Sequence, residues 1–353
     1  MKKLFKVFLI IALIAALAAV GFACNSNSGE DGKTGLLYKM YPGDDFYTVY
    51  GYVAEDGVTE LDIGDFNDDA NGVVIKRIKT GAFKDNDTIK KIIVPDTVET
   101  IDSGAFAKMR ALEEITLPFI GKTAVADVYF NSTDDSLAKD KSTGNERVFG
   151  YIFGSETYDY GVPCEQNSVT YYIPQTLRKV NVAPKVGSEY GIPMHAFSGN
   201  AWVSEVNLSS DVVAIGESAF EDNKWTETIN LDGIITIYDY AFKGAKNLKI
   251  ANLAALTKMG AESFSGCTAL NTVNVNTDIV ADAFNGCTSL TAITLGDGVS
   301  KIGARAFSNC TNIKADKITV SGTNSWTVGS ATVEFNAETV KDATYSVLLW
   351  TRA

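Results

Sequence analysis

The chain has 353 residues, and its 43 acidic and 31 basic side chains give a formal net charge of −12. This acidic surplus argues against nucleic acid and against an anionic membrane surface as partners. The single histidine, His195, leaves little for histidine-based catalysis or metal binding, and no cofactor is expected. Apolar residues make up 46% of the chain, which is ample for a buried core.

Residues 1–23 are typical of an export signal peptide, with basic residues first and an apolar run from Val7 to Ala19. The run is short for a membrane-spanning helix. Cys24 follows small residues and resembles the cysteine of a bacterial lipobox. The resemblance implies a lipid on its thiol, with residues 24–34 as a flexible tether to the membrane. Gly21 stands where a lipobox usually has Leu, so ordinary cleavage and a secreted protein stay the alternative.

Residues 35–72 precede the repeats and are expected to cap one end of the stack. Within them, residues 47–53 and 59–63 have the composition and alternation of strands. The loop Asn67–Gly72 spaces its oxygen-bearing side chains and glycine as a calcium loop does, but Ile78 occupies the place of the bidentate glutamate. A solvated turn and a calcium loop therefore both stay open.

A unit of about 22 residues recurs from residue 73 to residue 320, each copy containing a phenylalanine that follows a small residue. These phenylalanines are 20–23 residues apart, except for one gap of 91 residues that is close to four periods: Phe83, Phe106, Phe197, Phe220, Phe242, Phe264, Phe284 and Phe307. Such a period is typical of a leucine-rich solenoid. The ninth and eleventh residues after each Phe are mostly apolar with a polar residue between them, which predicts a short strand.

The fold class predicted is a strand-dominated α/β solenoid, a right-handed leucine-rich-repeat stack. Every coil repeats the direction of the previous one, so the strands should form a parallel sheet on one face. The Ala-Phe segment, which follows an inward isoleucine such as Ile101 or Ile215, predicts a single helical turn or a tight bend on the opposite side. Cys267, Cys287 and Cys310 share one repeat position, which indicates buried stacked thiols rather than a disulfide framework.

Residues 119–188 interrupt the period and predict an irregular insertion, with a polar stretch followed by a segment rich in aromatic residues. This segment is either a recognition patch or the packing of a widened coil. The candidate patch consists of Tyr151, Phe153, Tyr158, Tyr160, Tyr171 and Tyr172. Residues 321–353 change character again and predict a C-terminal cap, in which Trp326 and Trp350 close the last coil.

The sequence contains no nucleophile elbow, phosphate-binding loop, HExxH or CxxC motif, so a non-enzymatic protein is expected. The tenth residue after each Phe points away from the core and is mostly Asn or Thr. Side by side on a parallel sheet, these residues predict a polar strip suited to a protein ligand. The strip consists of Thr116, Asn207, Asn230, Asn252, Asn274 and Thr294. Asn and Thr as ordinary solvent-facing strand residues are the alternative.

The pattern AF..C..L..I.LP..V..I is nearly complete in Ala105–Pro118 and in Ala82–Ile101. It resembles the BspA-like family of bacterial surface leucine-rich-repeat proteins, over roughly residues 73–118 and 170–320. The resemblance implies an exported protein that adheres to extracellular matrix, to other cells or to partner proteins, with no catalytic repeat position. A structural envelope scaffold and a carbohydrate-binding module that uses the Tyr-rich insertion are the alternatives.

Overall fold

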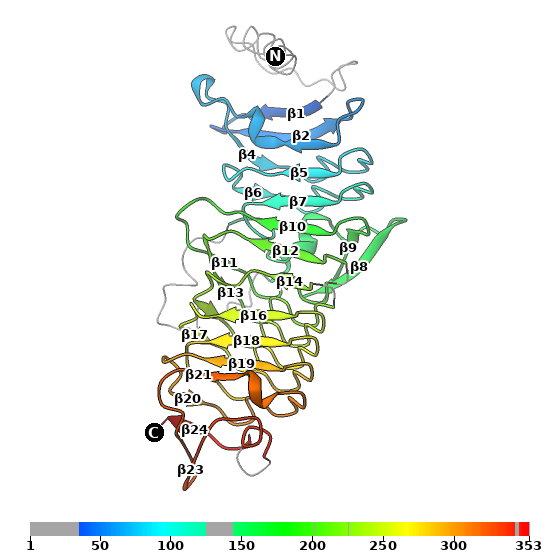
Figure 1. Cartoon of the computed structure of the whole chain (residues 1–353). Helices are drawn as coiled ribbons and strands as arrows, with labels where there is room; N and C mark the ends of the chain where they lie inside the picture. The colour runs from blue at the N-terminus through cyan, green and yellow to red at the C-terminus, as the bar shows by residue number, and fades with distance from the viewer. Residues whose placement is uncertain (1–34, 125–143, 201, 225, 343–345, 353) are drawn as a thin grey trace. The chain divides into compact units, whose positions relative to one another are not determined.

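The structure is a computed structural model that describes residues 35–124, 144–200, 202–224, 226–342 and 346–352. All of them belong to one compact unit, Gly35–Ala353. Its coils are stacked so that their strands form two columns, which Figure 1 shows side by side.

The first column contains the strands that the repeat pattern predicts. Six parallel strands form one sheet: β3 (Glu60–Asp62), β5 (Lys91–Ile93), β7 (Glu114–Leu117), β10 (Lys179–Val182), β12 (Glu205–Leu208) and β14 (Thr228–Ile229). Four more parallel strands continue the column: β16 (Ile250–Leu253), β18 (Thr272–Val275), β19 (Ala292–Leu295) and β21 (Ile318–Val320). Ile115 and Leu117 are fully buried and Thr116 between them is not, so the predicted alternation of faces is confirmed.

The second column was not predicted, because a single parallel sheet was expected. It contains β4 (Ile75–Ile78) and β6 (Thr100–Ile101), then β11 (Tyr190–Ile192), β13 (Val212–Ile215), β15 (Thr236–Ile237) and β17 (Lys258–Met259). The inward isoleucines Ile101 and Ile215 are members of these strands. Most coils thus have two short strands, and the stack has parallel sheets on two faces.

The segments around the repeat phenylalanines form tight turns, the second of the two predicted alternatives, and not helical turns. The helices whose bounds are resolved are short 3-10 segments elsewhere in the chain, and Ser346 is also helical: η1 (Ile63–Phe66), η2 (Asp69–Asn71), η4 (Gly144–Glu146), η5 (Phe149–Ile152) and η6 (Ala315–Lys317). The residues two before and two after each Phe have positive φ, such as Glu262 (51°) and Gly266 (75°) around Phe264. The Phe264 N–H donates to the Ala283 carbonyl of the next coil at 2.8 Å. Left-handed residues and hydrogen bonds to the next coil are incompatible with a continuous helix.

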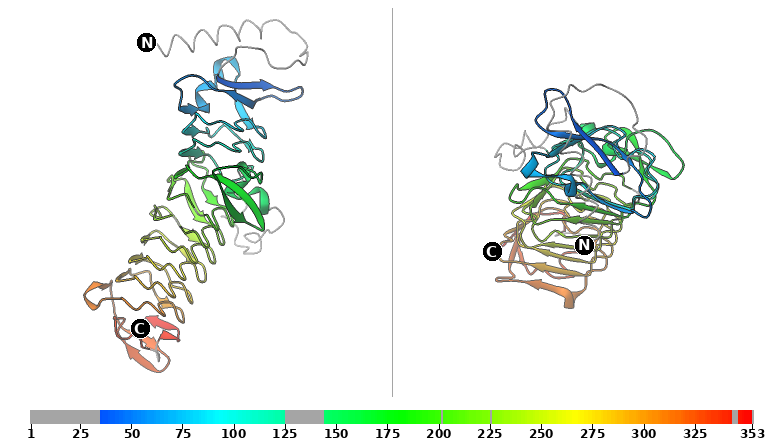
Figure 2. Two further views of the ribbon diagram at one scale, coloured as in Figure 1. Left: turned by 90° about the vertical axis from the view of Figure 1, so that its right-hand side faces the viewer. Right: turned by 90° about the horizontal axis from the view of Figure 1, so that it is seen from above.

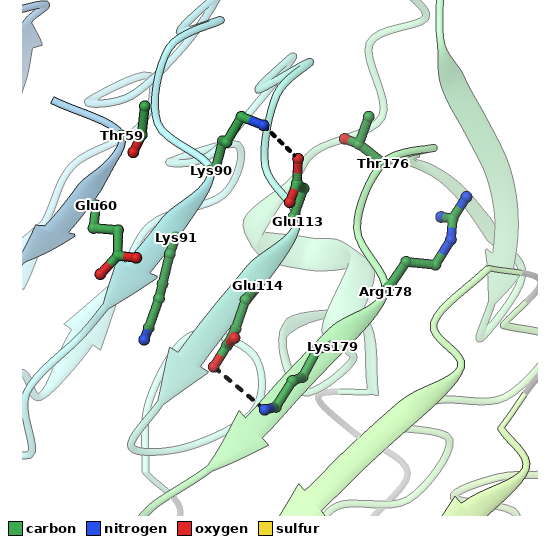
Figure 3. Close-up of a pocket in the computed structure, with 9 residues that line it drawn as sticks. All are labelled: Thr59, Glu60, Lys90, Lys91, Glu113, Glu114, Thr176, Arg178 and Lys179. Atoms are coloured by element: carbon green, nitrogen blue, oxygen red, sulfur yellow. Dashed lines mark hydrogen bonds and ion pairs between the residues drawn. The ribbon is translucent and has the colours of Figure 1, made fainter. Parts of the chain in front are cut away.

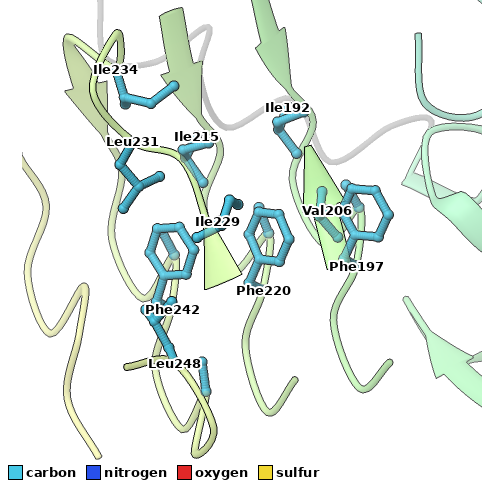
Figure 4. Packing of buried hydrophobic residues seen from close by; sticks show 14 of the residues in the cluster. Ile192, Phe197, Val206, Ile215, Phe220, Ile229, Leu231, Ile234, Phe242 and Leu248 are labelled. Carbon is cyan, nitrogen blue, oxygen red and sulfur yellow. The ribbon is translucent and has the colours of Figure 1, made fainter. Parts of the chain in front are cut away.

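The repeat phenylalanines form the centre of the core (Figure 4). Neighbouring rings are nearly parallel, with centroids 5.0 Å apart for Phe220–Phe242 and Phe242–Phe264 and 5.3 Å apart for Phe264–Phe284. Each of these side chains is at most 1% exposed. The ring spacing is close to the distance of about 4.8 Å between hydrogen-bonded strands, so one phenylalanine per coil stacks without distorting the sheets.

The column of rings continues through the insertion. Phe106 contacts Phe153 at 6.5 Å, Phe153 contacts Phe149 at 5.2 Å, and Phe149 contacts Phe197 at 5.1 Å. Consistent with this, β10 pairs directly with β7 on one side and with β12 on the other. The gap of 91 residues between Phe106 and Phe197 therefore makes two coil steps. Although 91 residues are close to four periods, the gap makes two steps and not four, because the extra residues form the irregular insertion.

Part of the insertion is the antiparallel hairpin of β8 (Gly161–Gln166) and β9 (Val169–Pro174), which lies on the side of the stack (Figure 2). Gln166 is fully buried and fixes the hairpin to the stack. Its Oε1 accepts from the Gly150 N–H at 2.7 Å, and its Nε2 donates to the Ala196 carbonyl at 2.9 Å. These two bonds join the hairpin to η5 within the insertion and to the coil that contains Phe197.

An exposed ion cluster fixes the loop before the hairpin. Glu156 pairs with Lys108 at 2.5 Å and with Lys84 at 2.8 Å, so it connects the insertion to two earlier coils. Hydrogen bonds from Lys108 and then Lys84 lower the pKa of the Glu156 carboxyl to about 2. The insertion is thus held to the stack by the buried amide of Gln166 and by the surface carboxylate of Glu156.

Antiparallel strands occur at both ends of the unit. β1 (Gly35–Met40) pairs with β2 (Tyr47–Val53), which confirms the strand predicted at 47–53. The C-terminal sheet has the order β20 (Lys301–Ile302), β24 (Trp350–Arg352), β22 (Trp326–Val328) and β23 (Ala331–Val333). In it, Phe335 contacts Phe307 of the last repeat at 5.6 Å, and Trp326 is fully buried. The right-handed winding and the assignment of both segments as caps stay predictions.

Candidate functional site

The predicted polar strip lies on the outward face of the first column of strands. Thr116 lies on β7, Asn207 on β12, Asn252 on β16, Asn274 on β18 and Thr294 on β19. The register places Asn252, Asn274 and Thr294 directly side by side. Together these residues form what we term the amide row.

The sequence prediction missed one member of the amide row. Asn181 on β10 lies between Thr116 and Asn207, with both as its direct register partners. The signal was present in Val180-Asn181-Val182, which repeats the apolar-polar-apolar pattern of the other strands. This pattern predicts that the strand register is restored here, but Asn181 was not included in the strip because no Ala-Phe pair precedes this strand at the usual distance.

In its N-terminal half, the amide row is hydrogen-bonded within itself. Asn207 Nδ2 donates to Asn181 Oδ1 at 2.9 Å and to Glu205 Oε1 at 2.8 Å. Asn181 Nδ2 donates to Thr116 Oγ1 at 3.1 Å and to Glu114 Oε1 at 2.8 Å. Both amide groups already have partners for their two protons, so they have little donor capacity for a ligand.

The C-terminal half of the row differs. Asn274 Nδ2 donates to Asn252 Oδ1 at 3.1 Å, and Asn252 Nδ2 donates to Asp232 Oδ1 at 2.7 Å. Each of these amides has one further proton, for which the described residues supply no partner. Thr294 Oγ1 likewise has no hydrogen bond within the described part of the chain. This half of the row is therefore ordered by its own bonds and still able to bond a ligand.

Asn230 is not a member of the hydrogen-bonded row. It follows β14, where the six-stranded sheet ends, and it is exposed. Its Oδ1 accepts from the Asp232 N–H at 3.0 Å, which is a local turn contact. Asp232, which the sequence did not predict as a member of the strip, is hydrogen-bonded to the row, because it accepts from Asn252.

Beside the N-terminal half of the row lies a shallow charged hollow (Figure 3), lined by Thr59, Glu60, Lys90, Lys91, Glu113, Glu114, Thr176, Arg178 and Lys179. Lys90 pairs with Glu113 at 2.9 Å, and Lys179 pairs with Glu114 at 3.8 Å. Arg178 lies over the Trp202 ring at 5.5 Å. The sheet face therefore consists of a charged region over β3–β10 and an uncharged region over β16–β19.

The candidate aromatic patch is largely part of the core. Phe153 is 1% exposed and Tyr171 is 4% exposed, and the Tyr171 hydroxyl donates to the Asn145 carbonyl at 3.0 Å. Tyr151, Tyr158 and Tyr172 are partly buried, and burial raises the pKa of Tyr158. Tyr160 is 61% exposed. This arrangement favours the packing of a widened coil over a recognition patch for most of the set.

The three repeat cysteines are free, buried thiols, as predicted. Each S–H donates to the carbonyl of the preceding coil's phenylalanine: Cys267 to Phe242 at 3.0 Å, Cys287 to Phe264 at 3.2 Å and Cys310 to Phe284 at 3.1 Å. Burial raises the pKa of the Cys267 thiol, so the reactive thiolate is strongly disfavoured. These thiols connect coils and are not a catalytic site.

The polar groups of the loop Asn67–Gly72 take part in the fold. Asn67 Oδ1 accepts from the Ile75 N–H at 2.8 Å, and Asp68 Oδ1 accepts from the Asn71 N–H at 3.2 Å. These contacts are typical of a structural turn. Elsewhere in the described residues, no group of three His, Cys, Asp or Glu side chains is placed to hold a metal ion.

The proposed lipidation residue, Cys24, lies outside the described residues, as do the predicted signal peptide and the predicted tether. In the part of the chain that is described, no helix combines the length and the apolar character needed to cross a membrane.

A family model of the BspA type leucine rich repeat region matches the chain in six copies, at residues 74–141, 176–280 and 275–328. These ranges cover more than half of the 353 residues. No curated protein matches the chain significantly.

Several solved structures are similar to the chain at low identity. A leucine-rich repeat protein from Bacteroides ovatus is 18% identical, with 81% of this chain and 94% of that chain covered and a TM-score of 0.29. A leucine rich cell surface protein from Faecalibacterium prausnitzii is 15% identical, with coverage of 85% and 78% and a TM-score of 0.36. A leucine-rich repeat protein from Eubacterium ventriosum is 18% identical, with coverage of 78% and 80% and a TM-score of 0.34.

Proposed function

The chain belongs to the family of BspA-type leucine-rich repeat proteins, and on that premise we propose that it is an exported cell-surface protein that binds other proteins. Its ligand is a protein of the extracellular matrix or of another cell surface, and its role is adhesion without catalysis. A protein-binding role fits the repeat family, in which stacked coils present an extended surface.

The observation that carries the proposal is the C-terminal half of the amide row. Asn252, Asn274 and Thr294 lie side by side on consecutive strands, are partly exposed and carry no charge. Their unused amide protons and hydroxyl group suit the peptide groups and polar side chains of a protein ligand. Because the row is already ordered by the bond from Asn274 to Asn252, little side-chain entropy is lost on binding.

The binding experiment uses residues 35–353, immobilised and exposed to a panel of purified extracellular-matrix and cell-surface proteins. Changing Asn252 and Asn274 to Lys should abolish binding of any ligand that the unmodified protein retains. The matched control changes Lys301, an exposed residue on β20 of the C-terminal antiparallel sheet, to Glu. Equal binding by the Asn variant would move the site away from the amide row.

For the anchor, we propose that Cys24 carries a lipid. The support is the leader and the polar tether of residues 24–34 in the sequence. Metabolic labelling with a fatty acid should tag the full chain in a bacterial host and should not tag Cys24→Ala. Equal labelling of both chains would show that the anchor proposal is wrong, and a secreted protein would then be the alternative.

A second candidate function, carbohydrate binding, rests on the exposure of Tyr160. Its ring is 61% exposed beside the β8–β9 hairpin, where Tyr172 is also partly exposed. Exposed aromatic rings can stack on sugar rings. Glycan-array binding that is lost in Tyr160→Ala and kept in the Asn252 and Asn274 variant would favour this function over the first.

A further inference from the structure

The charged hollow over β3, β5, β7 and β10 has a regular pattern of sign. The register places Glu60, Lys91, Glu114 and Lys179 on four neighbouring strands, each the direct partner of the next. The sign of the charge therefore alternates from strand to strand. Opposite charges on directly opposed residues stabilise a sheet, so this row also supports the fold.

The residues one position earlier form a second alternating row. Lys90, Glu113 and Arg178 precede β5, β7 and β10, and Figure 3 shows them beside the first row. Counting both rows, the hollow has four basic and three acidic side chains in a chain of net charge −12. It is a locally basic region on an acidic protein, so its composition differs from that of the surrounding surface.

Three of these side chains have no ion-pair partner in the described part of the chain: Glu60, Lys91 and Arg178, of which Arg178 lies over the Trp202 ring instead. Lys90 pairs with Glu113, and Lys179 pairs with Glu114 and, at 3.6 Å, with Glu205. Glu60 and Lys91 lie at the hollow without such a contact (Figure 3). A partner that supplies a cation to Glu60 and an anion to Lys91 would complete the pattern.

A second copy of the same surface supplies both charges. A two-fold axis that runs parallel to the strands places the second copy with its coils in the opposite order. Each residue of the second copy keeps the same position along the strand direction. With this axis between β5 and β7, Lys91 faces Glu114 of the second copy, and Glu60 faces its Lys179. In the second row, Lys90 faces Glu113 of the second copy. Every charged pair across this axis is of opposite sign, as an isologous interface requires.

Other positions of the axis fit less well. An axis that lies on a strand places like charges opposite each other, Lys91 on Lys91 for example. An axis between β7 and β10 leaves Glu60 without a cation. It also requires Arg178 to face Glu113, although Arg178 already donates to the Leu177 carbonyl at 3.2 Å and lies over the Trp202 ring.

We propose that two copies of this chain associate face to face through β3, β5, β7 and β10, with the two-fold axis between β5 and β7. Charge complementarity identifies a second copy as the occupant, because one two-fold axis pairs side chains of opposite charge in both rows. The contact leaves Asn252, Asn274 and Thr294 uncovered, so it goes beyond the proposed ligand binding and does not depend on it.

The test is sedimentation of residues 35–353, which contain the whole described core, at low salt and over a range of concentrations. The unmodified protein should dimerise, and raising the salt should weaken the dimer. Lys91→Glu and Glu114→Lys each reverse one charge at two symmetric contacts. Each variant alone should raise the Kd by about ten-fold or more.

Mixing the two variants in equal amounts decides the register. In the mixed dimer, one copy carries Lys91→Glu and the other carries Glu114→Lys. The two substituted side chains then face each other with opposite charges, and the unchanged Glu114 of the first copy faces the unchanged Lys91 of the second. The mixture should therefore dimerise as well as the unmodified protein, whereas an axis between β7 and β10 would leave two like-charge contacts. The control Lys249→Glu, which removes an ion pair with Glu227 outside the hollow, should have no effect on the Kd.

Circular dichroism shows whether each variant is folded. The proposal is overturned if the unmodified protein stays monomeric at about 1 mM, a concentration at which even weak specific contacts are populated. It is also overturned if the folded single variants dimerise normally, or if their mixture does not recover dimerisation.

Discussion

Phe149→Ala tests whether the ring column is continuous through the insertion. The Phe149 side chain is fully buried, and its ring contacts Phe153 at 5.2 Å and Phe197 at 5.1 Å. Truncating a buried phenylalanine costs ~3–5 kcal/mol of unfolding free energy, through the lost transfer energy and the cavity. Phe284, with ring contacts of 5.3 Å on both sides, is the matched regular position. The two alanine variants should lose similar stability, within ~1 kcal/mol.

The assay is urea denaturation of residues 35–353 followed by far-UV circular dichroism. In a stack where each coil contacts only its neighbours, a weakened coil in the middle uncouples the two sides. Phe149→Ala should therefore also broaden or split the transition, whereas Tyr160→Ala should change the unfolding free energy by less than ~0.5 kcal/mol. A loss below ~1 kcal/mol for Phe149→Ala would refute the reasoning, because the insertion would then not carry the core.

Three further results are expected. The pKa of Glu156 is about 2 in the folded chain and 4.5 ordinarily. The stabilisation from its ion pairs is therefore present above about pH 4.5 and is lost as the pH falls toward 2. Thermal melts of Glu156→Gln should lack this pH dependence. The thiols of Cys267, Cys287 and Cys310 should resist alkylation until urea unfolds the chain; rapid labelling of the folded protein would contradict their burial. Gly286→Ala, at φ 77°, should lower the unfolding free energy by ~1–2 kcal/mol in the same urea assay, and an unchanged value would show that this turn relaxes.

The strands of the first column could be predicted because their burial is periodic. Ile293 and Leu295 are fully buried on either side of Thr294, so the alternation in the sequence directly reflects the two faces of the strand. The buried thiols followed from the same register. The order of the strands also followed, because consecutive coils of one solenoid are neighbours in space.

The path of the chain through the insertion could not be predicted from spacing. Phe149 and Phe153 take the place of a single repeat phenylalanine, and neither follows the usual small residue. Gln166 secures this arrangement by hydrogen bonds to residues 16 and 30 positions away. Such contacts depend on which coils are neighbours, and the count of residues between Phe106 and Phe197 does not contain that information.

The sequence left a helical turn and a tight bend both open beside the phenylalanines, for a local reason. Glu262 and Arg305 have positive φ although neither is Gly, Asn or Asp, so their identities give no sign of the left-handed conformation. They are held there by the hydrogen bonds that each turn makes to the next coil. Arg305 and Asp282 also form an ion pair between coils, at 2.6 Å.

The sequence predicted that the residues of the polar strip form a row, but not which of their hydrogen-bond donors are free to bind a ligand. The outward position of Asn207 and Asn274 followed from the repeat register. Their difference did not, because Asn207 uses both amide protons on Asn181 and Glu205 whereas Asn274 uses one on Asn252. Only the second kind of amide retains a donor for a ligand, which restricts the candidate site to the C-terminal half of the row.

The central claim is that a protein ligand binds this C-terminal half, and a paired comparison of two row variants tests it most directly. Asn274→Asp keeps the shape but replaces both amide protons, the unused one and the one on Asn252, by a charged carboxylate. Asn207→Asp makes the same replacement at an amide whose two protons both have partners within the fold, so it controls for the added charge and the lost internal bonds. Surface plasmon resonance against a ligand that the unmodified protein retains should show at least about a ten-fold weaker Kd for Asn274→Asp, equivalent to ~1.4 kcal/mol, and less than about a two-fold change for Asn207→Asp. Equal effects of the two changes, or none for Asn274→Asp, would contradict the account.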